Sequence, residues 1–247
     1  MNENKITLFK KGFNFSQDGP GHRLVYHLAG CNMRCPWCSN PEGMHIKYLN
    51  NKQIVMTIDE MYEEIIQCKR LFFDGGGVTF TGGEATLQLD QLKELFALLK
   101  AADINATIET NGSSERLREL FPYMNFIIID FKHYDEKLHK KHTGLSNKIV
   151  KANIEKAIAS GLRALVRIPL INGFNASEED IEGFLTYFKL INKNNLNVEF
   201  LKYHEYGKDK WLKTSRDYRV ENGFISNQIY REFILRFKKA GIKVIKT

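Results

Sequence analysis

The chain has 247 residues, of which 43% are hydrophobic and 26% charged. These are ordinary values for a globular protein, and we expect a single domain over residues 1–247. No apolar run approaches the roughly 20 residues that span a bilayer, and the amino terminus lacks the apolar segment of a secretory signal. We therefore expect a cytoplasmic protein that binds no membrane. The net charge of +7 comes from dispersed lysines and arginines without an RNA-binding signature, so nucleic acid is not expected as a partner.

Apolar segments of strand length recur along the chain, at residues 22–30, 77–81, 105–110, 126–131, 164–170 and 198–203. Helical patterns follow most of them, at 57–72, 88–102, 147–161, 177–192 and 228–240. The first of these patterns begins at Thr57 with Glu60 three residues on, the spacing of a capping box, and a short last strand is expected at 243–245. Strands that alternate with helices indicate a parallel sheet. Six such units predict an α/β fold of the partial, open (β/α)6 barrel kind, with a doubly wound sheet as the alternative.

Chemically active residues stand directly after the expected strands. They are Cys31, residues 82–84, 109–112 and 130–132, Arg167 and His204. Because function in parallel α/β folds collects at the carboxyl ends of the strands, we expect these residues to share one site.

Three of the four cysteines fall within eight residues, as Cys31, Cys35 and Cys38, whereas Cys68 stands apart in a helical pattern. The C-x3-C-x2-C spacing lets one loop wrap a compact metal site, and thiolates are soft ligands that suit zinc or an iron–sulfur cluster. A zinc ion would need a fourth ligand, which His27 or His45 could supply.

A 4Fe–4S cluster held by three cysteines instead leaves one iron open to a substrate or cofactor. Trp37 and the Asn-Pro turn at 40–41 would shield such a redox site from water, and no second CxxC pair is present for a zinc ribbon. These features favour the cluster over zinc.

The cysteine triad, followed by Thr-Gly-Gly-Glu at 81–84, resembles the radical S-adenosylmethionine (SAM) superfamily. That resemblance implies a 4Fe–4S cluster whose open iron binds SAM, and a 5′-deoxyadenosyl radical that abstracts a hydrogen atom. Nearly the whole chain is similar to the activating enzymes of glycyl radical enzymes. The similar stretches lie in the family's order, at 17–23, 75–84, 110–112, 130–132, 142–144, 167, 203–207 and 211.

The family resemblance implies a partner glycyl radical enzyme, an electron donor such as flavodoxin or ferredoxin, and action as a monomer. A radical SAM enzyme acting on a small molecule is the alternative, and a zinc-bound interaction module is a further one. Residues 39–81 hold only Cys68 where several activating enzymes carry an inserted segment with extra cysteines, so one cluster is expected.

The same resemblance assigns candidate site residues. Those expected to bind SAM are Trp37, Cys38, Ser39, Gly83, Glu84, Asp130, Phe131, Lys132 and His204. Those expected beside the incoming substrate are Asp18, Arg167 and His204.

A member of the family also binds a monovalent cation near SAM through two acidic side chains and two backbone carbonyls. The matching positions are Glu109, Thr110, Ile128 and Asp130. Glu109 departs from the aspartate at that position, and its longer side chain changes the geometry offered to an ion.

Overall fold

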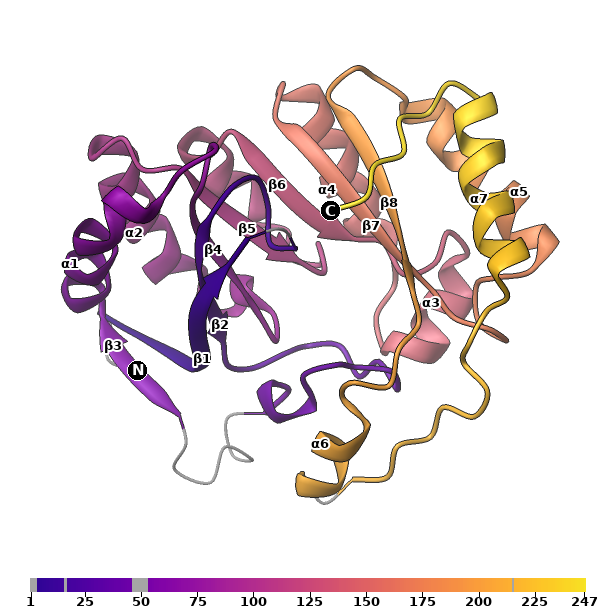
Figure 1. Ribbon diagram of the computed structural model, residues 1–247, viewed down its shortest axis with the longest axis horizontal. Coiled ribbons are helices and arrows are strands. Elements are labelled where there is room, and N and C mark those ends of the chain that lie inside the picture. Colours follow the sequence, from indigo (N-terminus) through magenta and orange to yellow (C-terminus); the bar gives the residue numbers. More distant parts are fainter. Residues whose placement is uncertain (1–3, 16, 46–52, 215) are drawn as a thin grey trace.

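The computed structural model describes residues 4–15, 17–45, 53–214 and 216–247. Its centre is one eight-stranded sheet in the order β3-β1-β2-β4-β5-β6-β7-β8. The strands are β1 (Lys5–Asn14), β2 (Arg23–Leu28), β3 (Ile54–Thr57), β4 (Gly77–Gly82), β5 (Ala106–Thr110), β6 (Phe126–Asp130), β7 (Arg163–Leu170) and β8 (Leu196–Lys202). The outermost strands β3 and β8 do not pair with each other, so the curved sheet remains an open barrel (Figure 1).

The six strands that the sequence predicted, β2 and β4 to β8, pair with one another in parallel. This confirms the parallel α/β fold. Two further strands were not expected: β1 and β3 extend the sheet beyond β2 as antiparallel strands. The second half of β1 is largely exposed and carries lysines, so its apolar pattern is too short to read as a buried strand.

The helices are α1 (Ile58–Cys68), α2 (Leu89–Ala101), α3 (Glu136–Thr143), α4 (Lys148–Ala159), α5 (Glu178–Ile191), α6 (Lys208–Lys213) and α7 (Asn227–Lys239). Helices such as α1, α2, α4, α5 and α7 lie outside the curve of the sheet, whereas α6 lies below the strands (Figure 1). Thr57 and Glu60 form the expected capping box at α1, and Ser177 with Asp180 forms one at α5. The short, polar helices α3 and α6 had no apolar period to reveal them.

The main hydrophobic core lies between the helices and the sheet, whereas the inner face of the barrel is largely polar. At the amino-terminal end of the strands the buried Arg23 guanidinium fills the interior, where it donates to the hydroxyls of Thr79 at 2.6 Å and Thr107 at 3.1 Å.

The carboxyl-terminal residues also lie within the curve of the sheet (Figure 1). Ile245 packs there against Phe126, Ile128 and Leu165. In place of the expected strand at 243–245, Val244 makes a single parallel bridge with Val198. Among the described residues, none of the helices has the length and apolar character needed to cross a bilayer.

Candidate functional site

The loop that carries Cys31, Cys35 and Cys38, called here the cysteine loop, begins at the carboxyl end of β2. Backbone hydrogen bonds fix it on both sides. Gly30 N–H donates to Gly43 C=O at 2.8 Å, and Cys31 N–H donates to Met44 C=O at 3.0 Å. On the other side, Glu84 N–H donates to the carbonyl of Gly30 at 2.7 Å. The loop therefore lies against the end of β4, where the Gly-Gly-Glu stretch begins.

Cys31, Cys35 and Cys38 all carry free thiols. Burial, together with a neighbouring cysteine of the triad, raises the pKa of Cys35 to about 11 and that of Cys38 to about 12. The ammonium of Lys132 lowers the pKa of all three thiols. The three sulfurs thus lie near one another and near a cation, in an environment that suits soft-metal ligation, which deprotonates thiols outright.

The number of these thiols suits a cluster better than a zinc ion. A structural zinc site takes four ligands, and the triad supplies three. A 4Fe–4S cluster held by three cysteines leaves its fourth iron open to a cofactor. Among the residues that the structure describes, no three or more His, Cys, Asp or Glu side chains are already arranged around a single metal ion.

A second segment, far along the sequence, holds the cysteine loop from outside. The indole N–H of Trp211 in α6 donates to Cys38 C=O at 3.0 Å, and Lys210 Nζ donates to Ser39 C=O at 3.0 Å. Lys210 also forms an ion pair with Glu42 at 3.1 Å. Sequence reasoning placed Trp211 only in a family-like stretch, and Lys210 was missed because nothing local links it to the loop.

Aromatic rings pack around the Trp37 side chain in the cysteine loop. This side chain is 9% exposed, and its ring centroid lies 4.4 Å from that of Phe174 and 6.3 Å from that of His142.

Gly83 and Glu84 join the cysteine loop to the strand ends. A Cβ atom at Gly83 would lie 2.1 Å from the Gly30 carbonyl oxygen. The protein's own backbone thus fills the space that a side chain at Gly83 would need. The Glu84 carboxylate is 1% exposed and accepts hydrogen bonds from Thr110 Oγ1 at 2.6 Å and Asn111 N–H at 2.7 Å. Glu84 therefore connects the ends of β4 and β5.

Comparison with known proteins agrees with this geometry. The radical SAM superfamily matches residues 25–185. The pyruvate formate-lyase-activating enzyme of Streptococcus mutans is 33% identical over 214 residues, which are 83% of this chain and 80% of that enzyme. The chain belongs to the radical SAM superfamily, within its glycyl radical enzyme activating enzymes.

Two further comparisons describe the range of this superfamily. The 4-hydroxyphenylacetate decarboxylase activating enzyme of Clostridioides difficile is 28% identical over 289 residues, covering 91% of this chain and 90% of the relative. The crystal structure of a radical SAM methyltransferase from Sphaerobacter thermophilus superimposes with a TM-score of 0.66 at 14% identity, over 98% of this chain and 72% of that one. The latter shows the shared fold.

The remaining residues expected to bind SAM lie at the end of β6, and their side chains point to different environments. Lys132 Nζ lies 3.0 Å from Asp130 Oδ2. Burial lowers the pKa of Lys132, but Asp130 and Cys35 outweigh this and raise it above its ordinary value, so the ammonium stays charged. The side chain of Phe131 packs in the outer core against Phe184, so only its backbone faces the site.

The two remaining candidates, His204 and Asp18, lie in different parts of the barrel. His204 follows β8 and stacks on Tyr206, with ring centroids 4.2 Å apart. Burial and the nearby Lys210 lower the pKa of His204, so the ring is neutral at neutral pH. Asp18 accepts a hydrogen bond from the Asn14 side-chain amide, and its carbonyl accepts one from Thr79 Oγ1 at 2.6 Å.

Arg167 lies on the apolar strand β7, where a buried guanidinium requires a negatively charged partner. Two glutamates of the chain provide this charge. Its guanidinium contacts Glu109 Oε1 at 2.6 Å and Glu199 Oε2 at 2.9 Å. Glu199 was not among the expected site residues, because a lone acidic residue in a strand carries no local signal. The substrate contact expected of Arg167 stays a prediction.

The positions expected to hold a monovalent cation do not fit one well. Glu109 is bound to Arg167 at 2.6 Å and Asp130 is paired with Lys132 at 3.0 Å. Thr110 and Ile128, of which the backbone carbonyls were expected to bind the ion, lie in the paired strands β5 and β6. Both expected carboxylate ligands therefore already have a cation from the chain.

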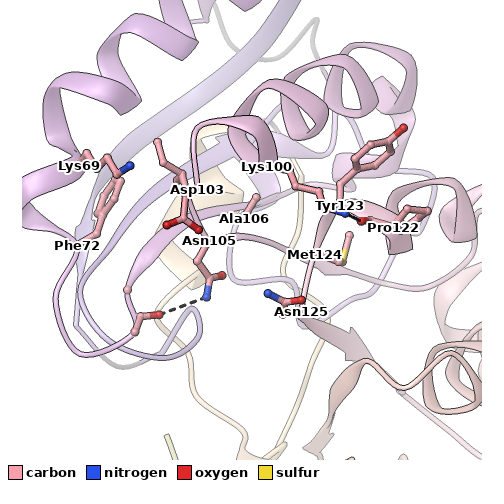
Figure 2. Close-up of a pocket in the computed structure, with 13 residues that line it drawn as sticks. Lys69, Phe72, Lys100, Asp103, Asn105, Ala106, Pro122, Tyr123, Met124 and Asn125 are labelled. Atoms are coloured by element: carbon pink, nitrogen blue, oxygen red, sulfur yellow. Dashed lines mark hydrogen bonds between the residues drawn. The ribbon is translucent and has the colours of Figure 1, made fainter.

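A cavity of about 470 Å³ lies at the opposite end of the sheet (Figure 2). It is lined by residues that precede β5 and β6, among them Asn105 and Asn125, and by Lys69 and Lys100. The two ammonium groups each donate to a backbone carbonyl, of Ala102 and Pro122, at 2.7 Å. Because the cysteines lie at the carboxyl ends of the strands, this cavity is separate from the candidate site.

Proposed function

We propose that this chain uses SAM and one 4Fe–4S cluster to remove a hydrogen atom from a glycine of a partner glycyl radical enzyme. The observation that carries the proposal is the set of three free thiols at the carboxyl ends of an open parallel sheet, beside the Gly-Gly-Glu edge and Lys132. The family membership supports the same reaction.

Each part of the site has a role in the proposal. When bound, the cluster and SAM supply the electron and the 5′-deoxyadenosyl radical that this chemistry requires. Cys31, Cys35 and Cys38 would hold the cluster, and Trp37 would exclude water from it. Lys132 would donate a charge-assisted hydrogen bond to the SAM carboxylate or ribose, a bond that contributes about 1.5–3 kcal/mol.

Several residues would complete the SAM site around these groups. Gly83 and Glu84 would present the end of β4 to the methionine amino group, with Ser39, Asp130 and the Phe131 backbone around it. A monovalent cation is not part of the proposal, since both of its expected acidic ligands are paired.

The substrate side of the proposal is a peptide loop that enters through the open side of the barrel. Asp18, Arg167 and His204 would face this loop, and a glycine suits the reaction because no side chain obstructs approach to its Cα. We further propose that the chain acts as a single-domain monomer in the cytoplasm. It would receive electrons from a small donor such as flavodoxin or ferredoxin.

The test is anaerobic mixing of the reduced, cluster-loaded protein with SAM and a candidate glycyl radical enzyme, of which pyruvate formate-lyase is the first choice. Electron paramagnetic resonance should show a glycyl radical on the partner, with 5′-deoxyadenosine formed in equal amount. Cys35→Ala should give neither signal. Turnover of a small metabolite with no partner present would instead favour the small-molecule alternative.

A further inference from the structure

The interior of the barrel holds a buried chain of charged groups that crosses most of the sheet. Arg167 on β7 stands at its centre, with a side chain 5% exposed. One side of the guanidinium contacts Glu109 on β5 and the other contacts Glu199 on β8. The guanidinium also donates to the carbonyl of Gln17 and to Thr247 Oγ1.

Both glutamates are held in place by further donors. Thr81 Oγ1, at the end of β4, donates to Glu109 Oε2 at 3.1 Å. The backbone N–H and hydroxyl of Thr247 donate to Glu199 Oε1 at 2.7 and 2.9 Å. The chain of contacts therefore runs from β4 to β8 and ends beside Gly83, where SAM is proposed to lie.

The length of Glu109 decides which cation it meets. An aspartate at this position would end about 1.5 Å closer to its own backbone, the length of one carbon–carbon bond. Its carboxylate would fall short of Arg167, which now lies 2.6 Å from Glu109 Oε1, and would be left to find another positive partner. A buried carboxylate without one is costly.

We propose that Arg167 is the built-in counter-ion of this site, and that it replaces a bound monovalent metal ion in organising the strand ends for SAM. The inference rests on the proposed function for its SAM site. A guanidinium carried on a strand is already in position, so it loses no translational freedom on binding as a free ion does. It also donates to both glutamates at once, which its planar fork permits.

The charges around this pair are consistent with the role. Arg167 contacts the carboxylates of Glu109 and Glu199. Asp130 and Asp18 act on the charge of Glu109, and Asp130 is itself paired with Lys132. Arg167 is thus a positioning residue: it acts on SAM through Glu109 and the end of β4.

The test compares buffers whose only small cation is tetramethylammonium with buffers of equal ionic strength that contain potassium or sodium. SAM affinity of the cluster-loaded protein, measured by anaerobic calorimetry, should change less than about twofold between them. Glu109→Asp should make SAM binding dependent on the metal ion, with an affinity gain of about tenfold, within the usual range of such couplings. Arg167→Gln should show the same dependence, while Glu94→Asp, a matched change at an exposed position, should not.

A second readout does not involve SAM. The thermal midpoint of the SAM-free protein should be insensitive to potassium in the wild type and should rise with potassium in Glu109→Asp. A wild-type protein whose midpoint or SAM affinity rises with potassium would overturn the inference, as would a Glu109→Asp variant that ignores the ion in both assays. Failure of the proposed function would appear differently, as absence of SAM binding in every buffer, and the thermal readout would still decide the inference.

Discussion

Replacement of Glu84 by glutamine separates a structural role of this carboxylate from a role in holding SAM. The side chain is 1% exposed, and its Oε1 accepts from the backbone N–H and hydroxyl of Thr86 and from the Thr110 hydroxyl. Its Oε2 accepts from Asn111 N–H at 2.7 Å. A glutamine keeps the first three bonds but turns its NH2 group toward the Asn111 N–H, so that two donors face each other.

The expected loss follows from that single contact. A hydrogen bond to a charged group contributes about 1.5–3 kcal/mol, and for a chain of this size 1 kcal/mol shifts the melting temperature by about 2–4 °C, so Glu84→Gln should melt about 3–12 °C lower. Thermal unfolding of the anaerobic, cluster-loaded protein, followed by circular dichroism, measures this. Glu63→Gln on the exposed face of α1 is the matched control and should stay within about 0.5 kcal/mol of the wild type.

SAM binding measured on the same samples completes the experiment. We expect weaker SAM binding together with the lower melting temperature, because the ends of β4 and β5 would no longer be held together. An unchanged melting temperature with SAM binding abolished would refute this reasoning, since Glu84 would then act on the ligand alone.

Three further predictions follow from the site. Cys31→Ala should abolish the cluster and Cys68→Ala should retain it, as measured by anaerobic iron and sulfide analysis; two clusters per chain would contradict this. Gly83→Ala should lose iron and stability together, because its Cβ would lie 2.1 Å from a backbone oxygen of the cysteine loop, whereas Gly12→Ala meets nothing within 4 Å and should retain both. Burial raises the pKa of Glu109 from 4.5 to about 7, with Arg167 opposing the rise. Its contribution to stability is therefore present below pH 4.5 and lost as the pH rises through about 7. Urea unfolding should show a shallower decline over that interval in Glu109→Gln, and parallel curves would exclude the titration.

The parts of the fold that could be predicted are those with a local signal. The strands β2 and β4 to β8 were visible because each is a largely apolar segment buried on both faces. The capping box at Thr57 located the start of α1 to the residue. The strand β1 was missed because only Ile6 and Leu8 are buried along it, which is too short an alternation to stand out.

The candidate site was predictable where a motif lies in one stretch and not where distant residues meet. The cysteine triad and the Gly-Gly-Glu edge could be found because their spacing is local. The pairing of Glu109 with Arg167 joins residues 58 positions apart, and the contact of Arg167 with Glu199 spans a further 32. Such partners depend on the order of strands in the sheet and on side-chain length. A short stretch of sequence does not reveal the strand order.

The attachment of α6 to the cysteine loop has a consequence for how the protein matures. Trp211 donates to Cys38 across 173 positions, and Lys210 to Ser39 across 171. A loop near the start of the chain thus acquires its final shape only after a segment near the end has been synthesised and has docked. Because contacts between such distant residues form late and slowly, the three thiols pass through a period on the ribosome when they are free but not yet arranged. Cluster insertion should therefore follow release of the completed chain. Iron and sulfide would then be delivered to a protein that has already folded.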